Sequence, residues 1–334
     1  MKNDDNKILA VPTNIITGFL GVGKTSAIMQ LLQQKPQNER WAVLVNEFGE
    51  IGVDGSLFEG NTVTKNSVFI KEVPGGCMCC ASGLPMQIAL NQLLDRAKPD
   101  RLLIEPTGLG HPLEVLQLLS NQYYQEVLSL EKTITLVDAR KFSDKRYTEH
   151  NTFNQQLEVA DIIIGNKADL YSDSDRAMLA DYLRSKHIVP KNMLFTEYGD
   201  IPLKWLAGAT QYKVTDAHHH HHDASNNDNA SNREIPSSGF VQAVNEGEGF
   251  QSIGWRFAPN QIFDRKKLIP LLLTIDAIRV KAVFITSDGV FGYNNTSDGI
   301  NEFILDECVE SRIEIICDEV IDTWHQELQQ AIIN

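Results

Sequence analysis

Three cysteines stand within four residues of one another: Cys77, Cys79 and Cys80 follow a pair of glycines. Cysteine thiolates bind soft metal ions such as Zn²⁺ and Cu⁺. Residues two apart on an extended chain face the same way, so Cys77 and Cys79 converge and Cys80 can join them through a turn. Three sulfurs leave the fourth position of a tetrahedral site open, which suits a site that receives and hands on a metal. A redox site, or small buried side chains in a glycine turn, are the alternatives.

A glycine-rich loop precedes the cysteines, and residues 18–25 have the complete pattern GxxxxGK[ST]. Backbone N–H groups of such loops close around a phosphate, helped by the positive end of the helix that follows. We expect Lys24 to bridge the β- and γ-phosphates and the Thr25 hydroxyl to bind Mg²⁺. The alternative is an ordinary glycine turn, which the full pattern between a strand and a helix disfavours. The expected phosphate contacts of this loop are Gly18, Gly21, Val22, Gly23, Lys24, Thr25 and Ser26.

A second phosphate-side motif begins where an apolar run at residues 102–104 ends in Glu105. We predict that Glu105 supports Mg²⁺ and its water shell, and that the Gly108 N–H meets the γ-phosphate. Many buried strands end in a carboxylate, so this motif carries weight chiefly because it accompanies the phosphate loop.

The tetrapeptide Asn166-Lys167-Ala168-Asp169 follows another apolar run and has the NKxD form. A carboxylate at Asp169 can accept hydrogen bonds from guanine N1–H and N2–H₂, whereas adenine would leave it unpaired. We expect Asn166 to brace the loop and meet the base edge, and the Lys167 stem to lie over the ring. A surface turn is the alternative. The pattern predicts GTP rather than ATP.

Acidic residues follow the second predicted strand, where P-loop GTPases have a mobile switch. Glu47, Glu50 and Asp54 are candidates to bind Mg²⁺, to polarise water or to complete the thiolate site. One or two of them are equally explained as solvated loop acids. The residues that we expect to be catalytic are Lys24, Thr25, Glu47 and Glu105.

Histidines offer weaker candidates for metal binding. Five of them occupy residues 218–222, where they form either a low-affinity metal collector or a compositional accident in a polar linker. Neutral imidazoles bind Zn²⁺, Ni²⁺ and Co²⁺ alike. His111 is a further candidate ligand, although a lone histidine is more often structural.

Composition restricts the functions that this chain of 334 residues can have. A hydrophobic fraction of 42% and a charged fraction of 22% are those of a globular protein. The net charge of −14 argues against nucleic acid and anionic membranes as partners. No apolar run approaches the ~20 residues of a membrane span, and the N-terminus lacks the order of a signal peptide. We therefore expect a cytoplasmic protein whose thiols stay reduced.

The motifs must be positioned by a sheet, because short apolar runs alternate with helical patterns through the first 200 or so residues. The predicted strands are residues 11–17, 41–45, 101–104, 133–137, 161–164 and 193–195, and the helices include 26–32, 86–94, 112–119 and 174–184. This alternation predicts an α/β fold, a mainly parallel sheet covered on both faces. The phosphate and base motifs then fall at the carboxyl ends of strands, where such sheets bind ligands.

A second, smaller α+β domain is predicted after a polar linker. We place the first domain at residues 1–210, the His-rich linker at 211–236 and the second domain at 237–334. Its predicted strands are residues 239–244, 253–257, 281–286, 289–293 and 312–317, and its predicted helices are 266–277 and 319–333.

Together the motifs resemble the CobW-type GTPases, relatives of the accessory GTPases UreG and HypB. ITGFLGVGKT, VNEFGEIGVD, PGGCMCC, LLIEPTGLG and NKAD stand in the family's order, and a CobW-type C-terminal domain corresponds to residue 238 onwards. PGGCMCC and EPTGLGHP look most like the YeiR-like zinc-binding subgroup.

The resemblance implies slow GTP hydrolysis coupled to delivery of a divalent metal, most often zinc, to a client protein. It places phosphate and Mg²⁺ on the loop ending at Thr25 with Glu105, guanine on Asn166, Lys167 and Asp169, and zinc on the three cysteines. Glu47 and Glu50 match a switch segment that can touch both ligands. A zinc buffer or sensor with incidental GTPase activity, and a P-loop phosphotransferase with a structural zinc, are the competing functions. The client and the oligomeric state, including a nucleotide- or metal-dependent homodimer, stay open.

Overall fold

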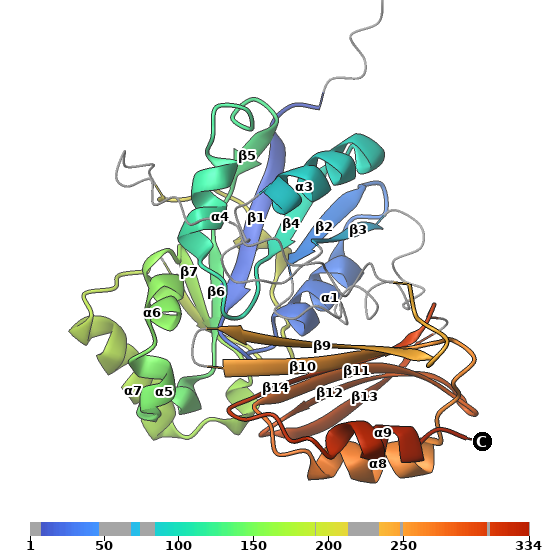
Figure 1. Cartoon of the computed structure of the whole chain (residues 1–334). Coiled ribbons are helices and arrows are strands. Elements are labelled where there is room, and N and C mark those ends of the chain that lie inside the picture. The colour runs from blue at the N-terminus through green and yellow to red at the C-terminus, as the bar shows by residue number, and fades with distance from the viewer. Residues whose placement is uncertain are drawn as a thin grey trace, which may run out of the picture. The chain divides into compact units, whose positions relative to one another are not determined.

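The computed structural model describes residues 8–46, 68–73, 84–190, 192–212, 234–247, 250–305 and 308–333. Contacts divide the chain into two compact units. The first contains the described residues 8–46 and 84–212 with most of strand β3, and the second contains those from 234 onwards (Figure 1).

The first unit is built on a sheet whose strands follow the order β3-β2-β4-β1-β6-β7-β8, with β5 beside β1. The neighbouring strands from β2 to β8 pair in parallel, and so do β1 and β5. The predicted parallel sheet is therefore confirmed. Its strands are β1 (Val11–Gly18), β2 (Trp41–Asn46), β3 (Val68–Val73), β4 (Arg101–Glu105), β5 (Leu128–Leu130), β6 (Ile134–Val137), β7 (Ile162–Gly165) and β8 (Asn192–Phe195).

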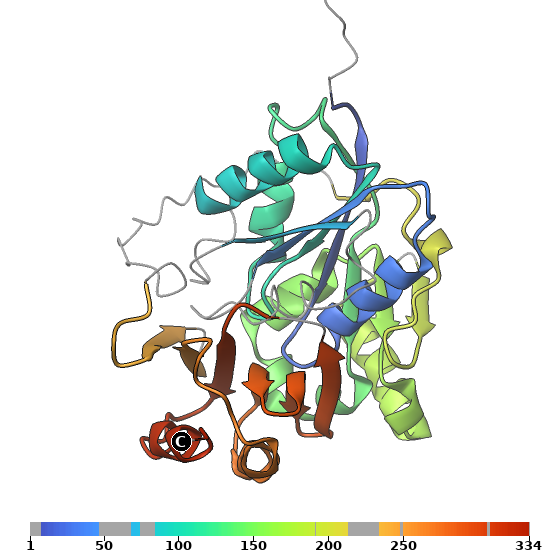
Figure 2. The same ribbon diagram turned by 90° about the vertical axis from the view of Figure 1, so that its right-hand side faces the viewer.

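Helices cover this sheet, with α1 on one face and α3 on the other (Figure 2). Strands β4, β6 and β7 are buried almost throughout, as expected for strands covered on both faces. The helices are α1 (Lys24–Gln34), α3 (Leu84–Ala97), α4 (Pro112–Leu119), α5 (Lys145–Thr148), α6 (Asn151–Glu158) and α7 (Asp173–Ser185), joined by the short 3₁₀ turns η3 (Ala139–Ser143), η4 (Ala168–Leu170) and η5 (Leu203–Trp205).

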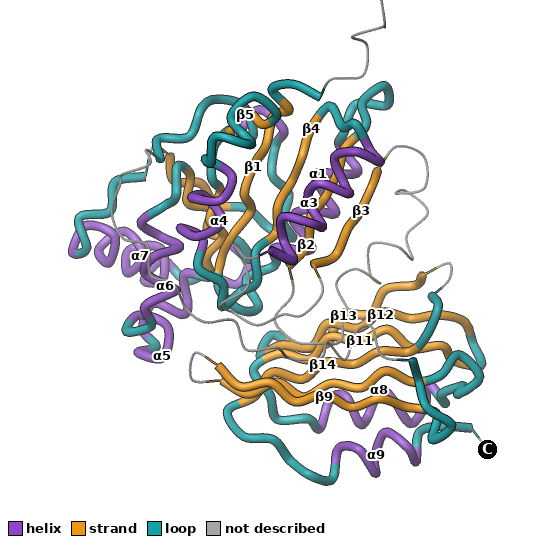
Figure 3. Tube along the Cα trace, turned by 45° about the horizontal axis from the view of Figure 1, so that its top comes forward, coloured by secondary structure: helices purple, strands orange, loops and turns teal. Residues whose placement is uncertain are grey.

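The second unit is an antiparallel sheet in the order β13-β12-β11-β14-β10-β9, with α8 and α9 on one of its faces (Figure 3). This arrangement confirms the predicted α+β class. Its elements are β9 (Phe240–Gly247), β10 (Phe250–Phe257), α8 (Arg265–Thr274), β11 (Arg279–Thr286), β12 (Gly289–Thr296), β13 (Gly299–Leu305), β14 (Ser311–Cys317) and α9 (Trp324–Gln330).

The last helix is shorter than predicted, because it begins at Trp324 and not at residue 319. The Val320 N–H donates to the Gln251 side chain at 3.1 Å, so this segment is tied to the start of β10. Past the helix, Ile332 forms a bridge with Phe263. Apolar spacing favoured one long helix, whereas these tertiary contacts shorten it at both ends.

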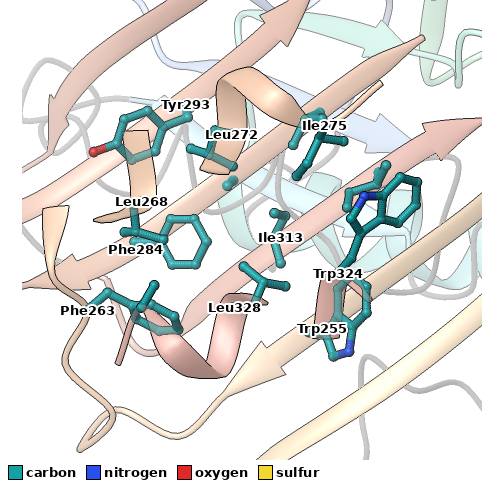
Figure 4. Close-up of a cluster of buried hydrophobic side chains, with 14 of the residues drawn as sticks. Trp255, Phe263, Leu268, Leu272, Ile275, Phe284, Tyr293, Ile313, Trp324 and Leu328 are labelled. Atoms are coloured by element: carbon teal, nitrogen blue, oxygen red, sulfur yellow. The ribbon is translucent and has the colours of Figure 1, made fainter. Parts of the chain in front are cut away.

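Apolar side chains on alternate residues of the strands face α8 and α9 and form the core of the second unit (Figure 4). Phe284 of β11 lies near its centre, and its ring centroid is 4.7 Å from that of Phe263. Trp255, Leu268 and Leu328 belong to the same cluster.

Truncating Phe284 to alanine should destabilise the second unit by about 3–5 kcal/mol, because the fully buried ring (0% exposed) leaves a cavity. Urea denaturation of the full chain, followed through the fluorescence of Trp255 and Trp324, measures this loss. Phe303→Ala on β13 is the matched control, since that ring is 42% exposed. Equal losses in the two variants would contradict this account of the core.

Candidate functional site

The predicted nucleotide motifs meet at one edge of the parallel sheet. β1 ends at Gly18, β4 at Glu105 and β7 at Gly165, directly before Asn166. β1 pairs in parallel with both β4 and β6, and β6 pairs in parallel with β7. Because parallel neighbours end on the same side, loops far apart in the sequence converge there.

The phosphate loop holds Lys24 folded back over its own backbone. Helix α1 begins at Lys24 after Gly23, whose left-handed φ of 92° requires a glycine. The Lys24 Nζ donates to Gly18 O at 2.9 Å and to Phe19 O at 3.4 Å, and the residue is only 6% exposed. A buried ammonium on backbone carbonyls, beside the N-terminus of α1, is suited to neutralise a bound phosphate.

Thr25 at the start of α1 and Glu105 at the end of β4 bring two oxygens together. The Thr25 Oγ1 donates to Glu105 Oε1 at 3.0 Å, and Glu105 is buried at the end of β4. Hydroxyl and carboxylate oxygens are hard ligands of the kind that Mg²⁺ prefers. The pair therefore fits the predicted ion, and its role stays a prediction.

The loop after β4 packs directly on the phosphate loop. A Cβ at Gly108 would lie 2.8 Å from Leu20 Cδ2 and 3.2 Å from the Leu20 backbone N, so a side chain here would force Leu20 to shift. The Thr107 hydroxyl accepts the Leu109 N–H at 3.1 Å, which closes the loop into a turn. The contact places the Gly108 backbone against the loop in which we predict phosphate binding.

Asn166 braces two loops, and bracing was one of the two roles predicted for its side chain. Its Nδ2 donates to Val22 O at 2.8 Å, and its Oδ1 accepts the Gly199 N–H at 3.0 Å. The side chain is 2% exposed and passes so close to Gly23 that a Cβ there would lie 2.6 Å from Nδ2. The amide therefore joins the phosphate loop to residues 196–200, whereas its contact with a base remains a prediction.

The rest of the NKxD segment turns sharply outwards. Lys167 adopts a left-handed φ of 63°, and the exposed Asp169 follows in η4. This backbone turn separates the buried Asn166 side chain from the Asp169 carboxylate, which remains accessible. The arrangement is compatible with a brace and a base acceptor within one tetrapeptide.

Two residues that lie beside this segment were not identified by the sequence analysis. Asp138, directly after β6, is buried and accepts from Arg140 Nε at 2.9 Å, while Lys167 Nζ lies 3.9 Å from its Oδ2. Tyr171 accepts the Ala139 N–H at 2.9 Å and donates to Asn166 O, and burial raises its pKa above the ordinary value. The rule that identified Glu105, a carboxylate ending a buried strand, would also have identified Asp138.

Several predicted ligands lie outside the described residues: Glu47, Glu50, Asp54, Cys77, Cys79, Cys80 and the five histidines at 218–222. Within the part of the chain that the structure describes, no three His, Cys, Asp or Glu side chains are grouped to hold a metal. The thiolate site therefore stays a prediction.

The described cysteines and His111 have other surroundings. Burial raises the pKa of both Cys308 and Cys317 to about 11, so these thiols stay protonated at neutral pH and are poor metal ligands. The His111 Nδ1 lies 3.0 Å from Gln155 Oε1, which gives this histidine a structural contact at the start of α4.

None of the described helices has the length and apolar character needed to cross a membrane.

Comparison with known proteins identifies the family of this chain. The family model described as "CobW/HypB/UreG, nucleotide-binding domain" matches residues 12–192. The zinc chaperone YeiR of Escherichia coli K12 is 37% identical over 340 residues, which cover 96% of this chain and 97% of YeiR. The zinc chaperone YjiA of the same strain is 32% identical over 172 residues, covering 50% of this chain and 52% of YjiA.

A crystal structure of the Zn(II)-bound YjiA GTPase from E. coli is 19% identical and covers 97% of this chain and 99% of its own, with a TM-score of 0.44. The family match and the near full-length similarity to YeiR agree with the motif order described above. The chain belongs to the CobW/HypB/UreG family.

Proposed function

We propose that this protein is a GTP-hydrolysing, zinc-binding metallochaperone, which couples GTP binding and hydrolysis to the transfer of a divalent metal to a client protein. One observation carries the nucleotide half: Lys24, Thr25, Glu105 and Asn166 converge at one edge of the sheet through the contacts described above. The similarity along nearly the whole chain to a protein named a zinc chaperone supports the metal half.

In this proposal each nucleotide group has a stated partner. Lys24 neutralises the β- and γ-phosphates, Asp169 accepts from guanine, and Thr25 and Glu105 would hold Mg²⁺. When bound, that ion would neutralise charge on the phosphate oxygens. None of the phosphate or base motifs contains arginine or glutamine to stabilise the transition state or orient water, so we expect slow intrinsic turnover.

The metal half rests on Cys77, Cys79 and Cys80, with Glu47 and Glu50 as candidates to connect metal and nucleotide. In the sequence, the cysteines stand between the switch-like segment at residues 46–54 and Glu105. We propose zinc as the cargo, a cytoplasmic location, and domains at residues 1–210 and 237–334. The proposed client is a protein that requires a metal.

Zinc affinity should differ between the GTP-analogue form and the GDP form of the full-length protein. A coupling of about 1–3 kcal/mol changes the dissociation constant roughly 5- to 150-fold, and it must be reciprocal. Competition with a chelating dye of known zinc affinity measures both constants.

The double variant Cys77→Ser, Cys79→Ser is the control for the site. It should lose tight zinc binding and the intense charge-transfer band of the Co²⁺-substituted protein. Equal zinc affinities in both nucleotide forms would remove the chaperone function and favour a zinc buffer or sensor. An unchanged Co²⁺ spectrum in the double variant would place the metal elsewhere.

A further inference from the structure

Helix α6 contacts both loops that surround the predicted phosphates. The Phe153 ring packs edge-on against Phe19 of the phosphate loop, with centroids 5.7 Å apart, and His150 at the start of the helix lies 4.8 Å from the same ring. One turn further on, Gln156 reaches the loop that follows β4. This short helix therefore connects two loops that the sequence separates by about 80 residues.

Gln156 makes its contacts from a fully enclosed position. Its Nε2 donates to Gly108 O at 3.0 Å and more weakly to Gly110 O at 3.5 Å, and the residue is 1% exposed. Two carbonyl acceptors at one end of the amide establish which end is the NH₂ group. The donors of Gln156 are thus directed at the backbone of a single loop.

The placement of this amide is not explained by packing alone. The Oε1 of Gln156 is buried without a hydrogen-bond partner among the described residues, which is unfavourable. An apolar side chain of similar volume would fill the space without that cost. The Thr135 hydroxyl donates to Gln156 O at 2.7 Å, which ties this position of the helix to β6. A glutamine supplies an N–H donor at this position, whereas a methionine of similar size would not.

Gly108 is the residue whose N–H we expect to meet the γ-phosphate. It lies close against the Leu20 backbone, and as a glycine it would otherwise have wide conformational freedom. A hydrogen bond to its carbonyl restricts that freedom. Because only GTP has a γ-phosphate, the restriction matters more for GTP than for GDP.

We infer that Gln156 is a positioning residue for recognition of the γ-phosphate: its amide holds the Gly108 and Gly110 carbonyls and thereby orders the loop that distinguishes GTP from GDP. This inference rests on the proposed function and on the predicted contact between the Gly108 N–H and the γ-phosphate.

Two substitutions remove the donor in different ways. Gln156→Met keeps the approximate length and volume but has no N–H, and Gln156→Glu keeps the shape but presents an acceptor to the Gly108 carbonyl. Glu158→Gln, an exposed change on the same helix, is the matched control. Dissociation constants for a non-hydrolysable GTP analogue and for GDP are measured on the full-length proteins, together with thermal unfolding.

We expect both variants to bind the GTP analogue at least about 10-fold less tightly than the parent, because a buried hydrogen bond is lost. The affinity for GDP should change by less than about twofold. Gln156→Glu should show the larger effect. Equal weakening for both nucleotides, whether or not unfolding shifts, would identify Gln156 as structural only, and unchanged affinities would also overturn the inference. If the unaltered protein bound neither nucleotide, the proposed function would fail and this inference with it.

Discussion

Lys24→Ala should lower the rate of GTP hydrolysis at least ~10²–10³-fold, the usual effect of removing one transition-state donor. The ammonium is held at the phosphate loop by Gly18 O and Phe19 O, beside the N-terminus of α1. Alanine there leaves the developing charge on the phosphates without its cation. Phosphate release under single-turnover conditions measures the loss.

The variant should keep its metal site, because nucleotide-free zinc binding by the cysteines does not need Lys24. Lys35→Ala is the matched control: it removes a lysine directly after the same helix, whose Nζ donates to Glu39 O at 2.8 Å. That control should hydrolyse GTP at the parental rate. Loss of both activities in Lys24→Ala would indicate a misfolded protein, or a metal site that forms only around bound nucleotide.

Asp169→Asn should exchange guanine specificity for xanthine specificity. The carboxylate is predicted to accept from guanine N1–H and N2–H₂, and an amide would place a donor against the N2 donor. Xanthine has N1–H and a carbonyl at position 2. The oxygen of an asparagine amide can accept from N1–H, and its nitrogen can donate to that carbonyl. Each mismatched contact costs about 1–3 kcal/mol, or roughly 5- to 150-fold in affinity.

Fluorescent analogues of GTP and xanthosine triphosphate measure the exchange directly. Asp173→Asn is the matched control, since it changes an exposed acid at the start of α7. It should leave both affinities unchanged. Parental GTP binding by Asp169→Asn would mean that the tetrapeptide is a turn, and the assignment of guanine would have to be withdrawn.

The amino-acid sequence was sufficient to predict the parallel sheet and the order of its motifs. Apolar runs such as residues 101–104 and 161–164 match β4 and β7 to within a residue at each end, because a strand buried on both faces has no polar face to obscure it. The phosphate loop was equally clear, since GxxxxGK[ST] specifies both a turn and a chemistry.

Elements with weak patterns were missed. β3, β13 and α6 were not predicted; β13 is largely exposed, and α6 has only Phe153 and Leu157 as large apolar residues. The position of β13 comes from its hairpin with the preceding β12, and that of α6 from packing on β1, which is distant in the chain. The periodicity of each segment alone carries little information about these contacts.

What the sequence alone determined is the set of chemical groups: a phosphate loop, a carboxylate at Glu105, a predicted guanine acceptor and three thiols. What only the tertiary structure decided is how those groups are held. Asn166 spans Val22 and Gly199, and Gln156 holds Gly108, across separations that no spacing rule covers. The physical reason is that a buried amide must find its hydrogen-bond partners wherever the fold brings them, which is a property of packing and not of neighbouring residues.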